Sequence, residues 1–98
     1  MKLHFENIVS FIAVVEEGSF SSAARKLGKS QSTVSIAVQN LESDLGFNLF
    51  NREHSKVWLT EKGKRLSQLS LPVVSKYREL ITIAEQMNLS DQIVYRVG

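Results

Sequence analysis

The chain has 98 residues, 43% of them hydrophobic and 22% charged, which fits one small folded domain with a short extension. The absence of cysteine excludes disulfide bonds, a cysteine nucleophile and thiolate zinc sites, and no apolar run is long enough for a membrane-spanning helix or a signal-peptide core. Twelve Lys and Arg against ten Asp and Glu leave a net charge of +2, which fits a nucleic-acid partner and equally fits a mixed, solvated surface.

Two helices are predicted near the N-terminus, since one proline and five glycines are too few for a turn-rich β-sandwich. Apolar residues at helical spacing predict the first over residues 5–17, ended by Gly18. Ser19 is a candidate N-cap for the second, over residues 20–27. The apolar stripe of that second helix is Phe20, Ala23, Ala24 and Leu27.

A third helix is predicted over about residues 31–44, with Ser30 as its N-cap and Gly46 after its end. It follows the second helix after a short turn that contains Gly28, which is the pattern of a helix-turn-helix over about residues 20–40. The expected buried face is Val34, Ala37, Val38, Leu41 and Leu45, and the opposite face carries Ser32, Ile36, Gln39 and Ser43.

Two short apolar runs, residues 47–52 and 57–60, flank the polar residues 53–56 and predict a β-hairpin. Trp58 has two interpretations in such a hairpin. We expect it in the hairpin core, and the alternative is a surface contact with the helix that follows.

A long helix is predicted from Glu61, with Thr60 as its cap. Its apolar residues recur every three or four positions, as in a coiled-coil seam that needs a partner. Pro72 removes one backbone donor and is expected to kink this helix. The alternative is a terminal helix folded back on its own domain. The predicted dimerisation residues are Leu66, Leu69, Val73, Tyr77, Leu80, Ile81, Ala84 and Met87, and Val74 widens the stripe.

The tail departs from this helical pattern. Residues 93–97 are rich in β-branched and aromatic side chains and are predicted to form a strand. The long helix is therefore expected to cover residues 61–89 only.

A series of residues through these predicted elements matches, in order and spacing, the pattern of a known protein family. The series is Phe11, Val14, Gly18, Ser19, Phe20, Ala23, Ala24, Leu27, Ser30, Gln31, Ser32, Ser35, Leu41, Glu42, Leu45, Gly46, Leu49, Phe50, Arg52, Leu59, Thr60 and Gly63. In this order it resembles the DNA-binding region of the LysR-type transcriptional regulators, densely over residues 3–66 and loosely beyond.

The resemblance implies a mainly α fold, a winged helix-turn-helix of three helices and a β-hairpin wing, followed by a long dimerisation helix. Residues 1–60 would form the winged domain, with the wing at about 48–60, residues 61–89 the linker helix, and residues 90–98 the start of a missing effector-binding domain. A small-molecule effector would bind only in that domain. We expect a regulator truncated at its domain boundary, with a naturally short protein as the alternative. The resemblance also implies a cytoplasmic, nucleoid-associated bacterial homodimer on double-stranded DNA, reading an inverted-repeat promoter site.

The start of the third helix offers short polar side chains to base edges in the major groove. Family members often carry a basic or polar residue where this chain has Ile36, which fits either a thymine-methyl contact or an ordinary surface residue. The candidate base-reading residues are Gln31, Ser32, Thr33, Ser35, Ile36 and Gln39.

No Lys or Arg lies between Ser30 and Asn51, so phosphate-neutralising charge must come from the flanks of the third helix. The candidate phosphate and wing residues are Arg25, Lys26, Lys29, Ser30, Arg52, His54 and Lys56, and Lys62, Lys64 and Arg65 follow at the start of the long helix.

A different class of function is a helix-turn-helix module that binds a protein and no DNA, favoured slightly by the weakly positive net charge and by a third helix without Lys or Arg. An enzyme has little support, because His4 and His54 are the only histidines and neither has metal-ligand or triad spacing with a second group. No catalytic residue, metal site or cofactor is expected.

Overall fold

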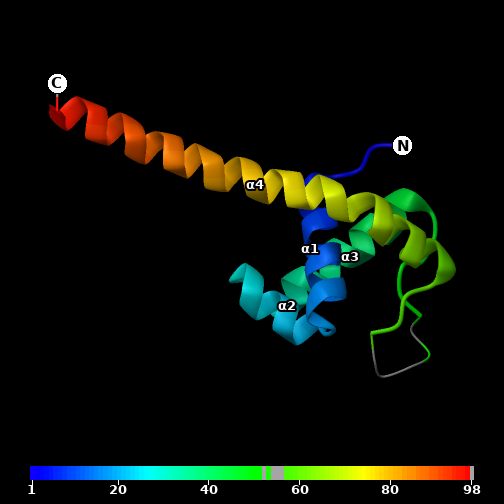
Figure 1. Ribbon diagram of the computed structural model, residues 1–98. Helices are drawn as coiled ribbons and strands as arrows, with labels where there is room; N and C mark the ends of the chain where they lie inside the picture. The colour runs from blue at the N-terminus through cyan, green and yellow to red at the C-terminus, as the bar shows by residue number, and fades with distance from the viewer. Residues whose placement is uncertain (52, 54–56, 98) are drawn as a thin grey trace.

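The computed structural model describes residues 1–51, 53 and 57–97, with side chains through Leu89, and contains four helices in that part of the chain (Figure 1). Helices α1 (Phe5–Glu17) and α2 (Phe20–Leu27) match their predicted ranges, and α3 (Gln31–Leu45) is one residue longer than predicted. Helix α4 (Glu61–Val97) is much longer than predicted. The mainly helical fold class is confirmed.

The turn between α2 and α3 is built as its sequence indicates. Gly28 adopts a left-handed conformation with φ of 66°, which suits a residue without Cβ. Two residues later the Ser30 hydroxyl accepts a hydrogen bond from the Thr33 amide at 3.1 Å and caps α3. Ser19 caps α2 in the same way, through the Ser22 amide at 3.0 Å. The two helices are therefore held in a fixed relation by local contacts.

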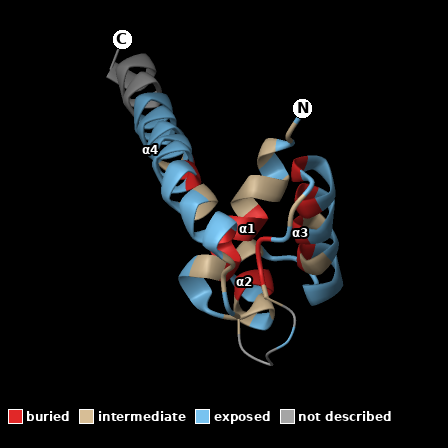
Figure 2. Cartoon of the chain, turned by 90° about the vertical axis from the view of Figure 1, so that its right-hand side faces the viewer, coloured by how far each residue is buried: buried red, intermediate tan, exposed pale blue. Residues whose placement is uncertain are grey.

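Helix α1 lies in the middle of the molecule, with α3 on one side and α4 on the other (Figure 2). Its residues from Ser10 to Val14 are buried. The apolar core gathers around it from every other element. Its buried members are Phe11, Ile12, Ala13, Val14, Ala23, Ala24, Val34, Val38, Leu41, Leu45, Leu49, Phe50 and Val74.

Of the predicted hairpin wing, the described residues show one antiparallel bridge, between Phe50 and Leu59, so the wing itself stays a prediction. The Asn51 amide donates to the Trp58 carbonyl at 2.7 Å, and the Thr60 amide donates to the Leu49 carbonyl at 2.9 Å. The described residues contain no longer strand. The Phe50 ring meets Phe11 and Phe20 edge to face, each at a centroid distance of 5.6 Å, so the base of the wing is part of the core.

The interpretation of Trp58 as hairpin core is wrong, because its side chain is 52% exposed. Val57 and Leu59, on either side of it, are half-buried and pack against the core. Successive side chains of an extended segment point to opposite faces, so burial of these two neighbours turns Trp58 outward.

Glu42 has a structural role that the sequence did not reveal. Its side chain is buried on the inner face of α3, and its carboxylate accepts hydrogen bonds from the amides of Leu49 at 2.7 Å and Phe50 at 3.4 Å. A buried carboxylate of this kind is stabilised by the backbone donors around it. Glu42 thus connects α3 to the first residues of the wing.

Gly63 marks a close approach between α4 and the wing. A Cβ added there would collide with the backbone carbonyl oxygen of Leu49, and it would also lie 3.1 Å from the Thr60 hydroxyl oxygen. The Thr60 hydroxyl itself donates to the Asn48 carbonyl at 2.7 Å and accepts from the Gly63 amide at 2.9 Å. The predicted cap of α4 is therefore confirmed, and it also joins the helix to the wing.

Helix α4 continues through Pro72 as one helix and includes residues 93–97, so the predicted strand there is wrong. A strand needs a neighbour to satisfy its backbone groups, and the described residues place none beside this segment, whereas a helix satisfies them internally. At 37 residues α4 is about 55 Å long and extends well beyond the other helices. It accounts for most of the longest dimension of the whole molecule, which is 61 Å. Only its N-terminal half lies along α1 (Figure 1).

We predict that Gly63→Ala destabilises the protein by about 2 kcal/mol, because the added methyl group overlaps backbone that cannot move independently. In an ordinary helical position the same change stabilises a protein by roughly 0.5–1 kcal/mol, so the sign of the effect is the test. Gly18→Ala, with open space around it and a φ of 76°, is the matched control and should cost about 1 kcal/mol through conformation alone. Urea unfolding of the wild type and the two variants measures these free energies. A stabilised Gly63→Ala protein would contradict the close contact between Gly63 and Leu49.

We also predict that Glu42→Gln lowers the free energy of unfolding by about 1–2 kcal/mol, since it removes a charged acceptor of two backbone amides. Asp44→Asn is the control, because it removes the same charge from an exposed position on the same helix and should change stability by less than about 0.5 kcal/mol. Equal effects in thermal unfolding would show that charge, not the hydrogen bonds of Glu42, is responsible.

Candidate nucleic-acid interface

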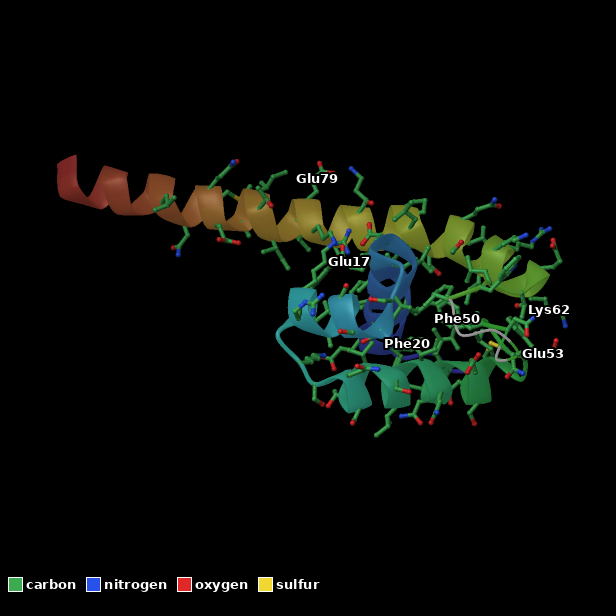
Figure 3. The ribbon with its side chains drawn as sticks, turned by 90° about the horizontal axis from the view of Figure 1, so that it is seen from below. Glu17, Phe20, Phe50, Glu53, Lys62 and Glu79 are labelled. Carbon is green, nitrogen blue, oxygen red and sulfur yellow. The ribbon has the colours of Figure 1, made fainter. Side chains whose placement is uncertain are left out.

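One side of α3 faces away from α1 and α4, and its side chains extend freely from the molecule (Figure 3). A shallow depression lies on this side, and we call its lining residues the outer face of α3. Their spacing of one, four, five and eight positions from the first places them on one side of a helix. The outer face consists of Gln31, Ser32, Ser35, Ile36 and Gln39.

The chemistry of the outer face is polar and uncharged with one apolar member. Gln31 and Gln39 carry amides that both donate and accept, and Ser32 and Ser35 carry hydroxyls. Ile36 lies among them with 55% of its side chain exposed. Amides and hydroxyls can hydrogen-bond base edges, and an aliphatic side chain can contact a thymine methyl group. Five of the six candidate base-reading residues therefore lie together.

Thr33, the sixth candidate, is placed differently. Its hydroxyl shares a hydrogen bond of 2.8 Å with the Ser30 hydroxyl, so it takes part in capping α3. It lines a neighbouring depression between α3 and α1, together with Lys29 and Asn40. The sequence analysis did not include Asn40 among the candidate surface residues. Its position four residues after Ile36 places it next to that residue on the helix surface.

The basic residues of α2 and the following turn differ in how many contacts they make with other side chains of the protein. Lys29 is exposed next to the start of α3. Arg25 is exposed and donates to the Ser22 hydroxyl at 3.0 Å. Lys26 lies 3.4 Å from a Glu16 carboxylate oxygen and 3.6 Å from one of Glu17. Lys29 and Arg25 are thus better placed than Lys26 to meet a phosphate group.

The wing candidates Arg52, His54 and Lys56 lie outside the described residues. At the start of α4, Lys62 lies over the Phe47 ring at 5.1 Å from its centroid. Lys62, Lys64 and Arg65 line a depression at the start of α4. They supply positive charge beside the wing.

The predicted dimerisation residues divide into two groups. Leu66 packs against the core, and the Tyr77 ring meets Phe5 edge to face at 4.9 Å. Val74 is completely buried against the rest of the chain. The remaining residues are exposed, and we call the four large apolar ones with the highest exposed fractions the free stripe of α4. The free stripe consists of Leu69, Val73, Leu80 and Met87.

The described residues hold no group of three or more His, Cys, Asp or Glu side chains that could bind a metal ion. None of the helices in that part of the chain is both long and apolar enough to cross a membrane. All of its buried side-chain nitrogen and oxygen atoms have hydrogen-bond partners.

Comparison with protein families matches residues 5–64 to the bacterial regulatory helix-turn-helix proteins of the lysR family. The transcriptional regulator CrgA of Neisseria meningitidis is 37% identical over 89 residues, which are 87% of this chain and 30% of that protein. The transcriptional activator TtdR of Escherichia coli K12 is 33% identical over 87 residues, covering 89% of this chain and 28% of that protein. The chain thus spans less than a third of the length of these relatives.

Solved structures of similar fold agree with the family match. The BenM DNA-binding domain in complex with benA site 1 DNA superimposes with a TM-score of 0.75 at 32% identity, covering 87% of this chain and 96% of that one. Oxidised OxyR of Corynebacterium glutamicum gives a TM-score of 0.78 at 27% identity, covering 86% of this chain and 27% of that one. With the family match over residues 5–64, these similarities show that the chain belongs to the lysR family of bacterial regulatory helix-turn-helix proteins.

Proposed function

We propose that this chain is the DNA-binding part of a LysR-type transcriptional regulator, which inserts the outer face of α3 into the major groove of double-stranded DNA. The observation that carries the proposal is the outer face itself, five uncharged side chains of which four carry hydrogen-bonding groups and the fifth is an exposed isoleucine. Support comes from the 32% identical BenM domain, which was solved with DNA. An enzymatic role has no support, since the relatives CrgA and TtdR are named as transcriptional regulators.

In this proposal, base reading and phosphate binding are assigned to different residues. The outer face of α3 contains no Lys or Arg, so it supplies specificity and little of the electrostatic affinity. Positive charge comes from Arg25 and Lys29 on one side, and from the wing and Lys62 on the other. The burial of Glu42 leaves Asp44 as the only exposed carboxylate of α3, which reduces repulsion of the DNA backbone.

We also propose a homodimer in which the free stripes of two α4 helices pair. An exposed row of large apolar residues on a long helix is typical of a coiled-coil partner surface. A symmetric dimer would present two recognition helices to an inverted repeat, with half-sites about one helical turn apart. Such a regulator would act in the bacterial cytoplasm at the nucleoid, and a further domain following α4 would bind its small-molecule effector.

Two neighbouring substitutions test the assignment of roles. Gln31→Ala should change the sequence preference of the protein, because the amide of Gln31 is available to a base edge. Lys29→Ala should weaken binding to all DNA and reduce the slope of log affinity against log salt by about one. Selection from a random duplex library, followed by titrations at several salt concentrations, measures both effects.

The control for this pair is Lys76→Ala, which removes a positive charge from α4, where Lys76 already pairs with Glu79 at 3.2 Å. It should leave both sequence preference and salt slope unchanged. A protein that binds no duplex in this selection would favour the protein-interaction alternative, and a Gln31→Ala variant with wild-type preference would refute the role given to the outer face.

The dimer is tested by Leu80→Glu, which places a charge in the free stripe and should convert the dimer to monomer at micromolar concentration. Gln86→Glu introduces the same charge on the same helix, about 120° around its axis, and should leave the dimer intact. Sedimentation velocity distinguishes the two species. A dimeric Leu80→Glu protein would exclude the free stripe as the interface.

A further inference from the structure

An ion-pair cluster joins three helices at the point where α4 leaves the body of the molecule. Two Arg78 nitrogens donate to the two carboxylate oxygens of Glu16, at 2.9 and 3.0 Å. Arg78 belongs to α4 and Glu16 to the last turn of α1, 62 residues earlier. Lys26 of α2 approaches the same carboxylate at 3.4 Å and that of Glu17 at 3.6 Å. The cluster therefore connects α4 with both α1 and α2.

Arg78 lies where α4 leaves the rest of the domain, so its ion pair with Glu16 can influence the direction of the exposed part of the helix. Arg78 is half-buried, whereas every residue from Glu79 to Leu89 is exposed. Arg78 is also the last residue of α4, among the described side chains, with an ion pair to another helix. Other contacts between the helix and the domain lie earlier, through the buried Val74 and the edge-to-face rings of Tyr77 and Phe5.

The Glu16–Arg78 contact differs in kind from those apolar contacts. Apolar packing is non-directional and allows a helix to rock, whereas a bidentate pair between guanidinium and carboxylate fixes both distance and orientation. The two side chains are 29% and 39% exposed, so the pair is partly shielded from solvent. The pKa of Glu16 is lowered, chiefly by the hydrogen bonds from Arg78, and the pKa of Arg78 is raised by Glu16, so both groups are charged at neutral pH.

A small rotation at this point has a large effect further away. A tilt of about 10° at Arg78 moves a point 20 residues further along the helix, roughly 30 Å away, by about 5 Å. That displacement exceeds the rise of about 3.4 Å per base pair. The angle at which α4 leaves the domain therefore determines how far apart two recognition helices lie in an α4-paired dimer.

We propose that Glu16 and Arg78 are a positioning pair that fixes the angle between α4 and the DNA-binding domain, and thereby sets the half-site spacing that the dimer accepts. This inference rests on the proposed function, because spacing has meaning only for a dimer on paired half-sites. Neither residue needs to touch DNA. Lys26 supports the pair from α2 by adding a second cation beside Glu16.

The test uses the 98-residue chain and an inverted repeat that the wild-type protein selects from a random duplex library. The probes are duplexes in which the spacer between the half-sites is lengthened or shortened by one or two base pairs. We expect the wild type to prefer one spacing by about tenfold, and Arg78→Gln to reduce this preference to about threefold or less. Binding to a duplex with a single half-site should change by less than about twofold, because the recognition surface is intact.

Three comparisons separate positioning from a general loss of charge or stability. Glu16→Gln should flatten the spacing profile as Arg78→Gln does, and the double variant should be no worse than either, since both break one contact. Lys76→Gln removes an equal charge from the same helix, where Lys76 pairs locally with Glu79, and should retain the wild-type profile. Because the chain has no cysteine, Ser43→Cys offers a single site for spin labels, whose distance distribution across the dimer should broaden in Arg78→Gln.

The outcomes are distinct. An Arg78→Gln protein with the wild-type spacing profile and a narrow distance distribution overturns the inference and leaves the proposed function intact. A wild-type protein that selects no paired half-sites overturns the proposed function and this inference with it. A profile flattened equally by Lys76→Gln also overturns the inference, because it would assign the effect to net charge.

Discussion

The backbone of Leu49 is the point on which the arrangement of this small domain depends. Its amide donates to the buried carboxylate of Glu42 on α3, its carbonyl accepts from the Thr60 amide, and the same carbonyl lies against Gly63 of α4. One residue between α3 and α4 is thus held both by α3 and by the start of α4. Because buried backbone groups need partners, neither helix can shift without breaking a hydrogen bond of the wing.

This constraint explains how a domain of 98 residues keeps two surfaces apart. The layers of α4, α1 and α3 place the outer face of α3 and the free stripe of α4 on different sides of the molecule (Figure 2). Helix α1 lies between them and is buried along its middle turns. A rigid central helix lets the position of one surface determine the position of the other, which is what a dimer on an inverted repeat requires.

The features that sequence could predict are those that neighbouring residues determine. The caps at Ser19, Ser30 and Thr60 and the bounds of α1 and α2 follow from side chains within one turn of each helix end. The roles of Glu42 and Gly63 depend on Leu49, seven and fourteen residues away, so no local pattern contains them. The sequence prediction for Trp58 was wrong because packing, not the local sequence, decides which face of so short a hairpin is buried. The strand predicted over residues 93–97 was wrong because β-propensity has little effect without a neighbouring strand. In the candidate site, helical periodicity placed Ser32, Ile36 and Gln39 on the outer face of α3. It could not show that the Thr33 hydroxyl is hydrogen-bonded to Ser30 at the cap of that helix.

Salt acts on this molecule through two different sets of charges. The cations proposed to meet phosphates, such as Lys29, are exposed, so added salt would weaken binding to every DNA sequence. The Glu16–Arg78 pair is only partly exposed and bidentate, so salt weakens it less. The outer face of α3 has no charge to screen, and its hydrogen bonds and the Ile36 side chain respond least. Under the proposed function, affinity, spacing preference and sequence preference would therefore be lost in that order as salt rises, because each would depend on a separate group of residues.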